Sequence, residues 1–159
     1  MICAMNVKAT TALMFALILG GCSSSYDLRA TIIDGKIAFV SEGKDFWGNP
    51  EPDCFYSISV QIVDGPPATP APGESVGTVR NGTYWNRTFA VTSCDNPFPV
   101  TYGAELQGPP FRENYQYEVD AKPLLKGFTY EVSASSKGSA YGARRFMLTK
   151  QGTIKNLPR

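Results

Sequence analysis

The sequence contains no histidine, and only four of its 159 residues are cysteine. Without histidine the chain cannot form a serine–histidine–aspartate or cysteine–histidine catalytic arrangement, and it lacks the most frequent general acid or base. The chain also has no histidine to act as a zinc ligand. We therefore expect a protein that is not an enzyme and that holds no metal ion and no cofactor.

The chain also lacks an excess of charge of one sign and a long apolar segment. It has 15 lysine and arginine residues against 14 aspartate and glutamate residues, with no basic stripe that could bind nucleic acid. The apolar run at residues 11–19 has nine residues, whereas a membrane-spanning helix needs about 20. Nucleic-acid binding and a transmembrane helix are therefore not expected.

Residues 1–21 have the parts of a bacterial export signal. Lys8 supplies a positive charge before the apolar run, and Gly20 and Gly21 are small enough for a peptidase site. The segment Leu19–Cys22 resembles the lipobox of bacterial lipoproteins, and Met1 and Met5 both fit as its start. The resemblance implies that residues 1–21 are removed and that Cys22 carries lipid. An ordinary secretory signal with an incidental cysteine is the alternative.

The lipobox resemblance also implies a location. Cys22 would carry a diacylglycerol thioether and an N-acyl chain, and several acyl chains anchor a protein stably. In enterobacterial lipoproteins an aspartate after the cysteine favours the inner membrane, so Ser23 indicates the outer membrane. We predict a lipid-anchored protein of the bacterial cell envelope, with residues 22–27 as a lipidated tether and residues 28–159 as one domain.

Two cysteines remain once Cys3 leaves with the leader and Cys22 is lipidated. In the oxidising cell envelope Cys54 and Cys94 are expected to form one disulfide. A redox pair is the alternative, but such pairs usually have the spacing Cys-x-x-Cys, which is absent. The loop closed by this bond spans about 40 residues, which corresponds to roughly 4 kcal/mol of stabilisation.

The remaining chain is patterned as short strands separated by turns. Asp34-Gly35 within residues 28–40 and Asn81-Gly82 within residues 76–91 are typical of tight hairpins between two strands. Apolar and polar residues alternate over residues 54–63, as in a half-buried strand. Further strands are expected at 99–106, 115–121, 128–135, 144–150 and 153–157. The pattern predicts an all-β fold, namely an antiparallel β-sandwich with seven to nine strands.

Residues 124–134 contain the spacing L-x-x-G-x-x-Y followed by alternating apolar residues. This segment resembles the E–F corner of fibronectin type III-like domains, although Lys126 stands where that family has proline. The resemblance implies an immunoglobulin-like or fibronectin III-like sandwich in which the Tyr130 hydroxyl bonds back to the main chain.

Aromatic residues near predicted loops are the remaining indication of a binding surface. Phe46, Trp47 and Trp85 are candidates, because aromatic side chains on loops often dominate protein interfaces. Trp47 is the best of them, since Gly48, Asn49 and Pro50 follow it and no strand is expected there. The alternative is that these rings close the ends of the core.

The leader, the strand pattern and the missing histidine together predict a non-catalytic binding or structural module of the envelope. Its partners would be the membrane, through lipid on Cys22, and another envelope protein or a polysaccharide. Two alternatives stay open. One is an inhibitor of a cell-wall hydrolase, by analogy of size and location. The other is a carboxylate-based hydrolase that uses Glu118 and Asp120, which are spaced to share a strand face.

Overall fold

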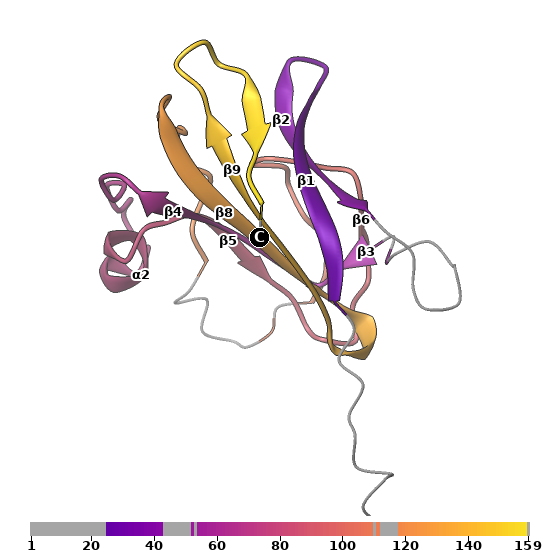
Figure 1. Cartoon of the computed structure of the whole chain (residues 1–159). Coiled ribbons are helices and arrows are strands. Elements are labelled where there is room, and N and C mark those ends of the chain that lie inside the picture. The colour runs from indigo at the N-terminus through magenta and orange to yellow at the C-terminus, as the bar shows by residue number, and fades with distance from the viewer. Residues whose placement is uncertain (1–24, 43–51, 53, 110, 112–117, 159) are drawn as a thin grey trace, which may run out of the picture.

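The computed structural model describes residues 25–42, 52, 54–109, 111 and 118–158 (Figure 1). The described residues form ten strands, one short helix and one 3₁₀ turn, so the all-β prediction is confirmed. In chain order the elements are β1 (Ser25–Ile33), β2 (Lys36–Glu42), β3 (Cys54–Phe55), β4 (Ser57–Asp64), α2 (Val76–Arg80), β5 (Thr83–Thr88), β6 (Asn96–Pro97), β7 (Val100–Thr101), β8 (Phe128–Ser136), η1 (Lys137–Ser139), β9 (Ala140–Leu148) and β10 (Ile154–Asn156). The count passes the expected nine because three strands have only two residues each.

Eight strands form one curled sheet in the order β5-β4-β8-β9-β1-β2-β7, with β10 also paired to β9, and β3 pairs with β6 in a second, two-stranded sheet. All neighbours are antiparallel except β1 and β9, which run parallel. This corrects the wholly antiparallel prediction. No hairpin connects β1 to β9, so nothing local imposes the antiparallel direction.

Strand β9 divides its free edge between two partners. Its first residues pair with β1, and its last three residues pair with β10. Asn156 joins the two partners: its side-chain oxygen accepts from the Ala30 nitrogen at 2.9 Å, and its side-chain nitrogen donates to the Ala30 oxygen at 2.8 Å. A side chain thus supplies the pair of hydrogen bonds that a neighbouring main chain would otherwise make.

The curled sheet encloses a core that is rich in aromatic rings. Tyr130 stacks on Phe146 with ring centroids 5.7 Å apart, and Trp85 meets Tyr102 edge-on at 5.4 Å. The largest fully buried side chains are Trp85, Tyr84, Tyr130, Phe39, Phe55 and Phe146. Large buried rings dominate the hydrophobic stabilisation of a domain, so strands β1, β2, β4, β5, β8 and β9 are held by this shared core.

The two hairpin predictions have different outcomes. Asp34 and Gly35 connect β1 to β2 with φ angles of 49° and 73°, which confirms the first hairpin. The predicted strand at 76–80 is wrong, because Val76–Arg80 is helix α2. The Ser75 hydroxyl caps this helix by accepting from the Thr78 nitrogen at 3.3 Å. A serine before a short turn of helix therefore outweighed the apolar pattern.

Candidate functional site

The start of β1 is fixed in the core. Tyr26 is only 2% exposed, and its hydroxyl forms a hydrogen bond of 3.0 Å with the Ser136 hydroxyl. Its ring lies so close to Gly142 that a Cβ atom there would be 2.4 Å from a ring carbon. Residues 25–27 pair with β9, so they belong to the sheet and not to the predicted tether of residues 22–27. The alternation Tyr26, Leu28, Ala30 is the sequence signal that could have placed this boundary.

The first row of the sheet crosses five strands at the end where β1 begins. Ser25 aligns with Tyr141, Tyr141 with Ser135, Ser135 with Ser57, and Ser57 with Thr88. We call this row the N-terminal end of the sheet. The turn between β8 and β9 and the segment that follows β5 both leave the sheet here, and Figure 1 shows the start of β1 beside the β8–β9 turn.

A disulfide joins Cys54 to Cys94, as predicted, with their Cα atoms 5.4 Å apart. Cys54 also faces Pro97 in the pairing of β3 with β6. The bond therefore ties the start of β3 to the segment that leads into β6. Residues 95–107, which follow the second cysteine directly, line a cavity.

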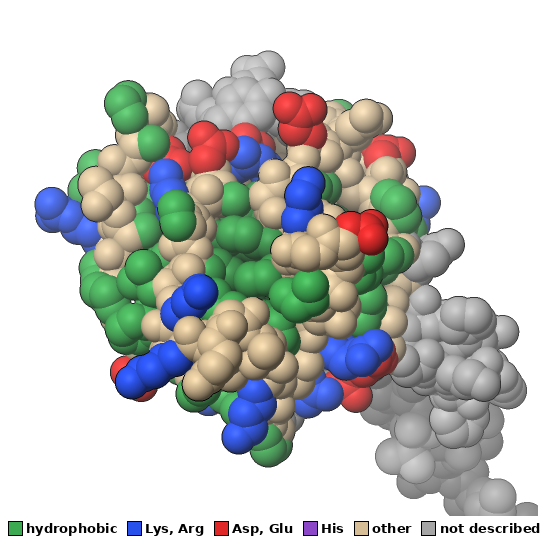
Figure 2. Space-filling view, turned by 90° about the horizontal axis from the view of Figure 1, so that it is seen from above, with side chains coloured by type: hydrophobic (Ala, Val, Ile, Leu, Met, Phe, Trp, Pro, Cys, Tyr) green, Lys and Arg blue, Asp and Glu red, His purple; other side chains and the backbone are tan. Residues whose placement is uncertain are grey.

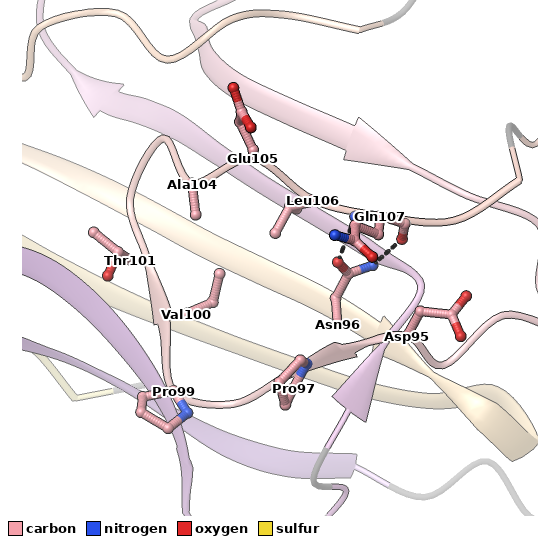
Figure 3. A pocket seen from close by; sticks show the side chains of 10 residues that line it. All are labelled: Asp95, Asn96, Pro97, Pro99, Val100, Thr101, Ala104, Glu105, Leu106 and Gln107. Carbon is pink, nitrogen blue, oxygen red and sulfur yellow. Dashed lines mark hydrogen bonds between the residues drawn. The ribbon is translucent and has the colours of Figure 1, made fainter.

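The cavity has a volume of about 400 Å³ and is open to solvent (Figure 3). Its lining residues all come from residues 95–107. The buried Asn96 side chain shapes it by donating to the Gln107 oxygen at 2.6 Å and accepting from the Gln107 nitrogen at 2.8 Å. These two bonds join the two arms of the loop that lines the cavity.

Two carboxylates, Asp95 and Glu105, border the cavity, and its ten lining residues include no lysine or arginine. Both carboxylates are exposed, and Asp95 accepts a hydrogen bond from the Ser93 hydroxyl. Carboxylate oxygens can accept hydrogen bonds from hydroxyl or amine groups of a ligand. The two carboxylates at the border of the cavity offer such acceptors.

A nearly buried ion pair links Glu74 to Lys122, whose side chains are 7% and 12% exposed. The Glu74 carboxylate accepts from the Lys122 ammonium at 2.5 Å and from the Ala71 and Asp120 nitrogens at 2.7 and 2.9 Å. Burial alone would raise the pKa of Glu74, but these donors outweigh it and hold the pKa below its ordinary value of 4.5. The ion pair links the loop before α2 to residues 120–122. No sequence motif predicted this ion pair.

The structure corrects one of the predicted binding residues. Trp85 is 1% exposed and lies opposite Val60 on the inner side of the sheet, so it packs in the core and cannot form a surface. Phe46, Trp47 and Cys22 lie outside the described residues. The aromatic Phe111, by contrast, is exposed.

The two carboxylates named for a hydrolase, Glu118 and Asp120, do not themselves belong to a strand. Among the described residues of the predicted strand 115–121, Val119 makes an isolated bridge to Asn86. The Asp120 side chain forms an ion pair with Arg87, and Glu118 is half-buried. Asp120 therefore has a cationic partner on β5.

Tyr130 makes the hydrogen bonds expected from its segment. Its hydroxyl accepts from the Leu125 nitrogen at 2.7 Å and donates to the Leu125 oxygen at 3.2 Å. Burial is the main cause that raises the pKa of Tyr130 to about 12. This residue therefore pins the connection that leads into β8 and has a structural role.

No protein-family model, no curated protein and no solved structure matches the chain. The part of the chain that the structure describes contains no cluster of three or more histidine, cysteine, aspartate or glutamate side chains arranged to bind a metal ion. In the same part, no helix has the length and apolar character needed to cross a bilayer.

Proposed function

We propose that this chain is a lipid-anchored lipoprotein of the bacterial cell envelope, located in the outer membrane, with lipid on Cys22. The domain that follows acts as a non-catalytic binding or structural module. One observation carries the proposal: the sheet begins at Ser25, three residues after the cysteine of the lipobox-like segment.

The burial of Tyr26 supports this start of the sheet. Its ring and hydroxyl are both held in the core, so the folded domain begins directly behind Cys22. Every strand described lies at or after Ser25, so the removal of residues 1–21 as a leader would take none of these strands away. A confirmed disulfide also suits the oxidising envelope.

A binding or structural role is supported by the chemistry of the chain. It has no histidine, so the side chain that most often serves as a general acid or base is absent. We propose another envelope protein or a polysaccharide as the partner, with Trp47 as the contact that the sequence predicts.

Metabolic labelling with palmitate tests the anchor. Cells that express the full chain should incorporate label into the protein, and Cys22→Ser should abolish it. Cys3→Ser is the matched control and should be labelled as the native chain is. Equal labelling of the native chain and the Cys22→Ser variant would overturn the proposed anchor.

Cross-linking in intact cells, followed by mass spectrometry of the captured material, tests the binding module. We expect one dominant envelope component that is lost in Trp47→Ala and kept in Phe111→Ala, which removes an exposed aromatic side chain at another position of the sequence. Turnover of a wall polymer by the purified protein would instead contradict a non-catalytic role.

A further inference from the structure

We infer that the N-terminal end of the sheet lies against the lipid surface, with Tyr141 and the β8–β9 turn in the headgroup layer of the membrane. This inference rests on the proposed lipid at Cys22. The proposed function gives the anchor alone, and the inference identifies the surface of the domain that faces the membrane.

The length of chain before β1 sets the distance. Only Ser23 and Ser24 separate Cys22 from Ser25, so the Cα atoms of Cys22 and Ser25 can be at most about 11 Å apart. Ser25 pairs with Tyr141, and neighbouring strands lie about 4.8 Å apart. The anchored glycerol is therefore within reach of the first row of the sheet.

The tether cannot lengthen by releasing the start of β1 without a cost to the core. Release would withdraw the Tyr26 ring from Gly142 and leave the buried Ser136 hydroxyl without this hydrogen bond. Exposing a large buried aromatic side chain to water is unfavourable, so the released state is disfavoured. The short tether and the buried tyrosine together hold this end of the domain at the membrane.

The side chains at this end suit a lipid interface. Tyr141 is 48% exposed, and its ring has one apolar body and one polar tip, as is typical of residues in the headgroup layer. Lys137 in the β8–β9 turn is exposed, and its ammonium group can approach lipid phosphates. Val91, on the segment that leaves β5 at the same end, adds an exposed apolar side chain.

The opposite end of the sheet then faces away from the membrane. The nine residues of β1 extend over about 26 Å, and the β1–β2 hairpin carries the exposed Ile32 and Ile33 at its far end (Figure 1). Figure 2 looks onto that end and shows hydrophobic side chains gathered in the middle, with charged side chains around them. A residue at this far end therefore serves as the control position in a test of the inference.

Site-specific photo-cross-linking in membranes of the expressing cells tests the inference. A benzophenone amino acid replaces Tyr141, Lys137 or Ile33 in the full chain, and lipid adducts are measured by mass after irradiation. We expect lipid adducts when the probe is at position 141 or 137 and no lipid adduct when it is at position 33. Ile33 is exposed to a degree similar to Tyr141 but lies at the far end of the sheet.

The outcomes separate the inference from the function on which it rests. If Cys22 carries no lipid in the same samples, the proposed function and the inference both fail. If Cys22 is lipidated but position 33 captures lipid, or positions 141 and 137 capture only protein, the inference alone is overturned. Two probe positions at the N-terminal end guard against one variant that fails to fold.

Discussion

At the scale of single residues, Glu74 is a nearly buried carboxylate that accepts hydrogen bonds from three donors. Its lowered pKa contributes stability that is complete above the ordinary value of 4.5 and is lost as the pH falls through the lower value of the folded protein. Glu74→Gln leaves Lys122 without its counter-charge and should lower the free energy of unfolding at neutral pH by about 2 kcal/mol.

Denaturant unfolding at pH 7 and at pH 4 measures this effect. The variant should lose less stability between the two pH values than the native chain does. Glu105→Gln, at an exposed carboxylate, should change neither value. An unchanged Glu74→Gln variant would show that the ion pair contributes nothing.

Tyr130 gives a second prediction at this scale. Its pKa of about 12 means that the stability it contributes is complete below the ordinary value of 10 and is lost as the pH rises toward 12. Tyr130→Phe removes both hydrogen bonds to Leu125 and should cost about 1–2 kcal/mol at neutral pH. Thermal unfolding can measure this, with Tyr141→Phe at an exposed position as the control. Equal melting temperatures for both variants would refute the role of the Tyr130 hydroxyl.

At the scale of elements, Asn156 holds β10 beside β1. Asn156→Ala would leave the main-chain nitrogen and oxygen of the buried Ala30 without partners, at a cost of about 2 kcal/mol. Hydrogen exchange should show faster exchange at Ala30 and along β10. Lys155→Ala, at an exposed position on the same strand, should leave exchange unchanged; faster exchange in both variants would contradict the argument.

The Cys54–Cys94 disulfide links β3 to the residues just before β6, and these two paired strands have only two residues each. The double variant Cys54→Ala/Cys94→Ala should be less stable by about 4 kcal/mol, because the unfolded chain gains the freedom of a large loop. Reduction should destabilise the native chain by a similar amount and leave the double variant unaffected. Equal denaturation midpoints for the native chain with and without reductant would contradict this.

At the scale of the whole molecule, the turns and the disulfide were predictable from the sequence, whereas the pairing of strands distant in the sequence was not. Asp34-Gly35 announced its hairpin, because few dipeptides accept positive φ at both positions. The pairing of Cys54 with Cys94 followed from the number of cysteines. By contrast, the parallel contact of β1 with β9 joins residues more than a hundred positions apart, and no local pattern encodes it.

The predicted binding residues show the same difficulty of inferring long-range structure from sequence. Trp85 was predicted to be accessible, but the strand that carries it turns it inward, opposite Val60. An aromatic residue beside a turn is compatible with either side of a sheet, and only the register decides between them. The early start of β1 could have been read from alternation, whereas its contact with Gly142 could not.

The mass of the intact protein extracted from membranes shows whether the sheet begins just behind a lipid-bearing cysteine. We expect one mature species that begins at Cys22 and carries the added mass of a diacylglycerol group and an acyl chain. A species that retains residues 1–21, or one that begins elsewhere with an unmodified Cys22, would contradict it.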